Sequence, residues 1–180
     1  MGWEDVIQAK STEIQMSVGF PPVARADARI LVLGSLPGER SIRERQYYAH
    51  PQNAFWRIMR ELVGAEGNYA MRCDALINAR IAIWDVLQQS VRPGSMDADI
   101  RLDTSEVNDF SGFFENHRQI RTICFNGKKA EQMFLRLVKL DTQPRLAPLP
   151  STSPAFASMP FEKKLEAWRK QIIGTREDGE

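Results

Sequence analysis

The sequence predicts an α/β fold, in which a central four-stranded parallel sheet lies between two layers of helices in a three-layer α/β/α sandwich. One pattern in the sequence favours this fold. Short apolar runs, several of them β-branched, alternate along the chain with longer segments of helical periodicity. Such alternation is typical of parallel sheets, whose strands are covered on both faces and joined by right-handed crossovers. The predicted strands are Arg29–Gly34, Ile81–Leu87, Arg121–Phe125 and Arg145–Leu149.

Residues 1–28 form a weakly patterned lead-in, because Gly19-Phe-Pro-Pro22 interrupts helical structure. At most a short helix is expected there, followed by extended chain. The first strand stops at Gly34. The loop after it, Ser35–Asn53, is longer than a plain connection needs, and long loops in compact domains are usually functional.

The helix Ala54–Val63 follows this loop, with Asn53 or Gln52 as its N-cap, and Gly64-Ala-Glu-Gly67 ends it. A second short helix is predicted over Tyr69–Asn78. In the first of these helices the apolar residues Phe55, Ile58, Met59 and Leu62 fall on one helical face.

The second strand brings Asp85 close to its carboxyl end and leads into a polar loop, Gln88–Asp97. A helix from about Thr104 to Asn116 then directs several phenylalanines inward. The third strand meets Asn126-Gly127, where the chain turns into the helix Lys128–Lys139.

The fourth strand contains Pro148, which predicts an edge position, because proline cannot donate a backbone hydrogen bond to a neighbouring strand. A loop, Pro150–Phe156, separates it from the last amphipathic helix, Pro160–Ile173. The charged tail Gly174–Glu180 is expected to fray. The 180 residues fit a single domain over the whole chain, 1–180.

The composition is ordinary for a globular protein, with 43% hydrophobic and 26% charged residues, and no apolar run is long enough to span a membrane. No secretory signal is visible, which predicts an intracellular protein, cytoplasmic or associated with a bacterial nucleoid. Cys73 and Cys124 lie among apolar residues and are expected to be buried thiols. With so few Cys and His, no metal site is predicted. Gly34-x-x-x-Gly38 resembles neither a Walker loop nor a dinucleotide fingerprint, so no cofactor is predicted either.

Two segments, Gly34-Ser-Leu-Pro-Gly38 and Tyr48-Ala-His-Pro-Gln-Asn-Ala-Phe-Trp56, together resemble the first active-site motif of the uracil-DNA glycosylase superfamily. The resemblance is greatest to the hypoxanthine-DNA (deoxyinosine) glycosylase branch, and the mismatch-specific uracil glycosylases are also similar. It implies a cofactor-independent, monomeric enzyme acting on double-stranded DNA that contains a deaminated base. In the mismatch-specific relatives, an Asn that positions water stands where this chain has Leu36. The resemblance therefore moves the catalytic role to Asn53.

A neutral amide such as that of Asn53 can orient a water without being a strong base, and the competing interpretation of this residue is a helix N-cap. By the same resemblance Tyr48 stacks on the extruded base, and its alternative is a tyrosine packed in the loop. His50 is expected to shape the loop rather than to transfer protons. The resemblance also places Ser35 and Leu36 at the base.

Asp85 lies near the strand end that reads the base edge in several relatives. Uracil and hypoxanthine share a lactam, a ring N–H beside a carbonyl, so a carboxylate could accept the N–H of either base. A carboxylate that caps its own loop is the alternative for Asp85.

Pro150-Ser-Thr-Ser-Pro154 is similar to the second motif of the superfamily, although Leu149 replaces the family His. Hydroxyl groups here can bind phosphates, and the alternative is a plain surface turn. The loop after the motif forms a wedge in relatives, so Phe156 or Met159 could fill the gap left by a flipped base or instead cover the core. The predicted phosphate-binding residues are Ser151, Thr152 and Ser153.

Asn126-Gly-Lys-Lys129 begins a helix, whose free N–H groups can bind a phosphate, so Gly127 and Lys128 are predicted to contact DNA. Both lysines could equally be solvated side chains. The net charge of +1 is low for a DNA-binding enzyme. The sequence thus predicts a monofunctional DNA glycosylase of base-excision repair, with a catalytically weak or inactive nucleic-acid-binding module as the alternative.

Overall fold

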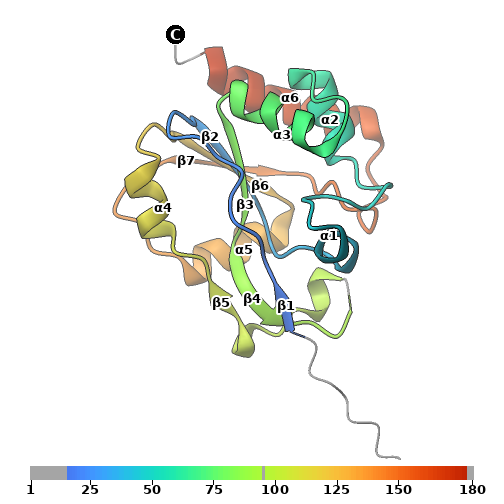
Figure 1. The fold of residues 1–180 in the computed structure, drawn as a ribbon, viewed down its shortest axis with the longest axis vertical. Helices are drawn as coiled ribbons and strands as arrows, with labels where there is room; N and C mark the ends of the chain where they lie inside the picture. Colours follow the sequence, from blue (N-terminus) through green and yellow to red (C-terminus); the bar gives the residue numbers. More distant parts are fainter. Residues whose placement is uncertain (1–15, 95, 178–180) are drawn as a thin grey trace, which may run out of the picture.

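The central sheet has four parallel strands in the order β3-β2-β6-β7 (Figure 1). The structure, a computed structural model, describes residues 16–94 and 96–177. Every neighbouring pair in this sheet is parallel, which confirms the predicted fold. The strands are β2 (Ile30–Gly34), β3 (Ile81–Asp85), β6 (Thr122–Asn126) and β7 (Arg145–Leu149).

Helices cover both faces of this sheet (Figure 1). The last helix continues to Glu177, four residues past the predicted end at Ile173, so the predicted fraying tail is helical over Gly174–Glu177. Residues 178–180 lie outside the described residues. No described helix is both long and apolar enough to cross a membrane. The helices are α1 (Glu39–Glu44), α2 (Phe55–Val63), α3 (Tyr69–Asn78), α4 (Phe110–Asn116), α5 (Lys128–Leu137) and α6 (Phe161–Glu177).

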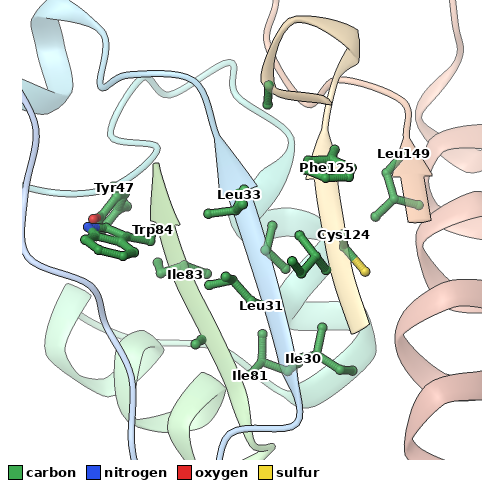
Figure 2. Close-up of a cluster of buried hydrophobic side chains, with 14 of the residues drawn as sticks. Ile30, Leu31, Leu33, Tyr47, Ile81, Ile83, Trp84, Cys124, Phe125 and Leu149 are labelled. Carbon is green, nitrogen blue, oxygen red and sulfur yellow. The ribbon is translucent and has the colours of Figure 1, made fainter. Parts of the chain in front are cut away.

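The core lies on both sides of the sheet, and every residue of β2, β3 and β6 is buried. Continuous apolar runs therefore suit these strands, and each fully buried Leu, Ile or Phe contributes roughly 1.5–3 kcal/mol. By contrast β7 is an edge strand with Pro148 exposed, as predicted. Figure 2 shows side chains of all four strands in one cluster, among them Ile30, Leu31, Leu33, Ile81, Ile83, Cys124, Phe125 and Leu149.

A second, antiparallel sheet of three strands was not predicted. The strand predicted over Ile81–Leu87 ends at Asp85 in the structure. Leu87 instead begins a new strand, which continues into the segment where a polar loop was expected. The backbone N–H groups of Val86 and Leu87 donate to Gly34 and Ser35, which leads the chain out of the central sheet. The residues after Leu87 form a strand because they pair with Met16–Val18 in the lead-in segment. The strands are β1 (Met16–Val18), β4 (Leu87–Val91) and β5 (Glu106–Val107).

The helix predicted from about Thr104 is shorter than expected, because α4 begins only at Phe110. The carboxylate of Asp109 accepts from the N–H of Gly112 at 3.0 Å and caps this helix, while the chain before it pairs with β4. The long loop Ser35–Asn53 also contains an unpredicted helix, α1. Much of the lead-in, where at most a short helix was expected, falls on residues 1–15, outside the described residues.

Candidate active site

The predicted site residues meet at the carboxyl edge of the central sheet. Gly34 at the end of β2 pairs with Asp85 at the end of β3, and Asn126 at the end of β6 pairs with Leu149 of β7. Pro150 follows Leu149 directly. Because all four strands are parallel, these residues lie along one edge, as the alternating pattern predicts.

Asp85 is a buried carboxylate, 4% exposed, and its Oδ2 has no hydrogen-bond partner among the described residues. Its backbone carbonyl accepts from the side-chain amide of Asn108 at 2.8 Å, so Asn108 holds the backbone at the end of β3. The pKa of Asp85 is raised to about 7, first by burial and then by the nearby charge of Asp97, while the charge of Arg92 acts in the opposite direction. This carboxyl therefore changes charge near neutral pH.

Tyr48 lies beside Asp85 with an unusual backbone conformation, at φ +56°. Its ring stacks on Phe55 with centroids 4.0 Å apart. Its hydroxyl is buried and has no hydrogen-bond partner in the described part of the chain, and burial raises its pKa. A Cβ atom on Gly34 would overlap the Asp85 carboxylate and lie 3.3 Å from the Tyr48 hydroxyl. The glycine thus gives these two polar groups their space.

Asn53 is partly buried, and its Oδ1 accepts from the N–H of Phe55 at 2.9 Å. It stands one residue before the N-cap, Ala54, so neither Asn53 nor Gln52 is the N-cap itself. The N–H of Asn53 donates to the carbonyl of His50 at 2.9 Å, and Nδ1 of His50 accepts from Gln52. His50 therefore shapes this turn, as expected.

Thr152 in the second motif is tied into the protein by all of its polar groups. Its hydroxyl accepts from the amide of Asn126 at 2.8 Å, its N–H donates to Oδ1 of Asn126 at 2.9 Å, and its carbonyl accepts from Ala54. With 1% exposure, Thr152 joins the second motif to β6 and to the start of α2.

The neighbouring residues of the second motif are partly exposed. The hydroxyls of Ser151 and Ser153 each accept a backbone N–H at 3.2 Å, which leaves their own protons free to donate. Gly127 has φ +93°, and its N–H donates to the carbonyl of Leu149. Lys128 is exposed at the start of α5.

The structure places the two first-motif residues that were predicted to contact the base in different surroundings. The side chain of Leu36 is 5% exposed and belongs to the hydrophobic core. Ser35 is also buried, and its hydroxyl donates to Oδ1 of Asp97 at 2.6 Å. Although Asp97 as a residue is exposed, this oxygen faces the site.

The loop after the second motif presents an exposed aromatic side chain. Phe156 is 36% exposed and does not cover the core, whereas Met159 is half-buried. The buried Lys164 of α6 donates to the carbonyl of Phe156 at 2.6 Å and lies 5.0 Å from its ring centroid. This lysine holds the loop in position.

The two cysteines, Cys73 and Cys124, are buried free thiols, as predicted. Within residues 16–94 and 96–177, no group of three or more His, Cys, Asp or Glu side chains is placed to hold a metal ion.

The sequence profile described as "Uracil DNA glycosylase superfamily" matches residues 21–172. The chain belongs to this superfamily. Two curated relatives named "Hypoxanthine DNA glycosylase" are 43% identical (Methanosarcina acetivorans) and 42% identical (Methanosarcina barkeri) over 115 residues, 62% of this chain and 72% of each relative. A solution NMR structure from Methanosarcina acetivorans, named as a candidate uracil DNA glycosylase, matches 88% of this chain and 99% of its own with a TM-score of 0.73 and 36% identity.

Membership in the uracil DNA glycosylase superfamily confirms the expectation of a DNA glycosylase and does not favour the alternative of an inactive binding module. Two residues of this glycosylase that lie around Asp85, Asn108 and Arg92, were not predicted from the sequence. Arg92 is 1% exposed and donates to the carbonyls of Leu36 and Pro37. Its surroundings in the sequence are polar, so no local pattern indicates its burial.

Proposed function

We propose that this protein is a monofunctional DNA glycosylase that hydrolyses the N-glycosidic bond of deaminated bases in double-stranded DNA, hypoxanthine first and uracil second. The names of the curated relatives support this substrate class. The enzyme acts as a monomeric single domain inside the cell, in base-excision repair, and without a cofactor. Neither motif contains a lysine for a Schiff base, so no strand cleavage is expected.

The observation that carries the proposal is the unpartnered carboxylate oxygen of Asp85 at the edge of the sheet. Burying a polar atom without a partner is costly, and a ring N–H of the substrate would provide one. The lactam edge of hypoxanthine or uracil offers this donor. Adenine and cytosine carry a lone pair at the equivalent ring nitrogen, which an ionised carboxylate repels.

The base must leave the helix before Asp85 can bind it, and flipping costs a few kcal/mol. In our proposal Tyr48 stacks on the extruded base, and the backbone at Ser35 and Leu36 forms the adjoining wall, since both side chains are engaged within the protein. Phe156 enters the space that the base leaves, an assignment supported by its exposure on a loop held by Lys164.

Cleavage develops positive charge on the sugar, and a water must be aligned with the anomeric carbon. We propose that the side-chain amide of Asn53 orients this water. Its Oδ1 is held by the N–H of Phe55, and a carbonyl oxygen has a second lone pair for a water proton. The contact that fixes the helix start thus also orients the amide.

Phosphate contacts come from the partly exposed Ser151 and Ser153, from Lys128, and from the backbone around Gly127 and Thr152. Thr152 contributes by holding the second motif in place, since its own polar groups are bound within the protein. This assignment changes the predicted role of Thr152 from direct contact to support.

Single-turnover cleavage of deoxyinosine and deoxyuridine duplexes, with alkali to reveal abasic sites, tests the proposal. We expect Asn53→Ala to lower the rate by about 10²-fold or more, the scale for one preorganised transition-state contact, with little change in DNA affinity. Asn53→Asp is the matched variant that keeps an acceptor for the N–H of Phe55. A wild-type protein that releases neither base contradicts the function. A wild-type rate for a destabilised Asn53→Ala protein makes Asn53 purely structural.

A further inference from the structure

Arg92 is among the largest fully buried side chains of the described residues, although arginine is rarely buried without a paired charge. Its guanidinium donates to the carbonyl of Leu36 at 3.4 Å and to that of Pro37. Among the described residues, its Nε has no hydrogen-bond partner and no carboxylate forms an ion pair with it within 4 Å. The charge of Arg92 is therefore buried but not directly neutralised.

The two carbonyls belong to the first-motif loop, which connects Gly34 to α1. Arg92 follows β4, so its side chain links the second sheet to this loop across 56 residues of sequence. Bonds to a charged donor are stronger than bonds between neutral groups. The guanidinium consequently fixes the loop beside Asp85.

Several charged or titratable groups surround this pair. The carboxylates of Asp97, Asp85 and Asp99 act on Arg92. Lys129 acts on Asp97, whose Oδ1 accepts from Ser35. The charge of Asp85 also acts on the phenols of Tyr47 and Tyr48. Burial and the charge of Asp97 favour the neutral acid of Asp85, whereas the charge of Arg92 favours its carboxylate.

We infer that Arg92 is a positioning residue of the site: its buried guanidinium fixes the first-motif loop beside Asp85, and its charge favours the carboxylate of Asp85 that accepts a base N–H. The second half of this inference rests on the proposed function. Arg92 acts through Asp85 and the loop backbone, since its bound N–H groups face Leu36 and Pro37. An opposite charge nearby typically shifts the pKa of a carboxyl by about 1–3 units.

The first test follows the ¹³C carboxyl signal of Asp85 by NMR from pH 5 to 9 in the DNA-free protein, with Asp85→Asn to assign it. Arg92→Gln keeps side-chain donors for the loop but removes the charge, and we expect the midpoint to rise by about 1 unit or more. Arg92→Lys keeps the charge and should stay close to the wild type. Arg118→Gln, an exposed arginine, is the matched control. A folded Arg92→Gln protein with an unmoved midpoint overturns the inference.

The second test measures single-turnover cleavage of a deoxyinosine duplex across the same pH range. The wild-type rate should rise through the Asp85 midpoint, the rise should move upward in Arg92→Gln, and Asp85→Asn should remove it. An inactive wild type contradicts the proposed function while leaving the NMR test intact. An active wild type with an unshifted Arg92→Gln profile overturns the inference instead. If Arg92→Gln does not fold, Asp97→Asn decides, because it must lower the midpoint; an unchanged midpoint there counts against charge control of Asp85.

Discussion

Gly34 illustrates how a single residue sets the geometry of the site. A side chain at this position would occupy the space of the Asp85 carboxylate, and the Tyr48 hydroxyl lies just beyond. Gly38, four positions later in the same motif, faces open space. A methyl group would therefore disturb the surrounding side chains at Gly34 but not at Gly38.

We expect Gly34→Ala to destabilise the protein by about 1–3 kcal/mol through overpacking, and to abolish most base release because the Asp85 carboxylate must move. Gly38→Ala is the matched control and should change stability by less than about 1 kcal/mol. Urea unfolding measures both. Equal stabilities for the two variants would show that the Gly34 contact relaxes without strain.

Asp85 should make stability depend on pH. Its pKa rises from 3.8 in the unfolded chain to about 7 in the folded protein. Between these values the folded state holds a proton that the unfolded state has lost, so the contribution of Asp85 to stability is most favourable below pH 4, falls as pH rises, and levels off above about pH 7. The full change is roughly 4 kcal/mol at most.

Melting temperatures of wild type and Asp85→Asn from pH 4 to 8 test this dependence. The difference between the melting temperatures of the two proteins should change across this pH range, because asparagine does not titrate. Asp74→Asn, which alters an exposed carboxylate on α3, should follow the wild type. Parallel curves for wild type and Asp85→Asn would contradict the raised pKa.

At the scale of elements, the paired hydrogen bonds between Asn126 and Thr152 join the end of β6 to the second motif. The carbonyl of Thr152 extends this connection to Ala54 before α2. Three elements thus depend on one buried threonine. This arrangement holds the second motif against the start of the helix that carries the first motif.

Thr152→Val removes the acceptor of the Asn126 amide and leaves a buried donor unsatisfied, which costs about 1–3 kcal/mol. Hydrogen exchange should also quicken at the Thr152 amide. Thr142→Val makes the same chemical change at an exposed position and should stay within about 0.5 kcal/mol of wild type. Similar losses in both variants would mean that the buried network adds nothing.

At the scale of the whole molecule, the net charge of +1 gives little general attraction for DNA. If Ser151, Ser153 and backbone groups supply most phosphate contacts, few counterions are released on binding. The logarithm of affinity should then fall only gently with the logarithm of salt concentration. A steep dependence would indicate further Lys or Arg contacts.

Lys128→Ala should lower the salt slope by about 1, the effect of losing one phosphate contact. Lys139→Ala, beyond the other end of α5, is the matched control and should leave the slope unchanged. Fluorescence anisotropy on a deoxyinosine duplex at several salt concentrations measures the slopes. An unchanged slope in Lys128→Ala would place this lysine away from the phosphates.

The sequence by itself determined the central sheet and the edge that holds the site. Strands such as Ile30–Gly34 are continuous apolar runs that suit a sheet covered on both faces, and Pro148 indicates an edge strand. Parallel strands end at one edge, so Asp85 and Asn126 had to lie near Gly34. The motif residues identified the family without any structure.

Only the tertiary structure decided which of these side chains are free to contact DNA and which are bound within the protein. Leu36 packs into the core, Thr152 is bound within the protein, and Arg92 is buried behind the first-motif loop. The strand Leu87–Val91 forms because it pairs with the distant segment Met16–Val18. Each outcome depends on contacts between residues far apart in sequence, whereas periodicity and turn chemistry report only on neighbours along the chain.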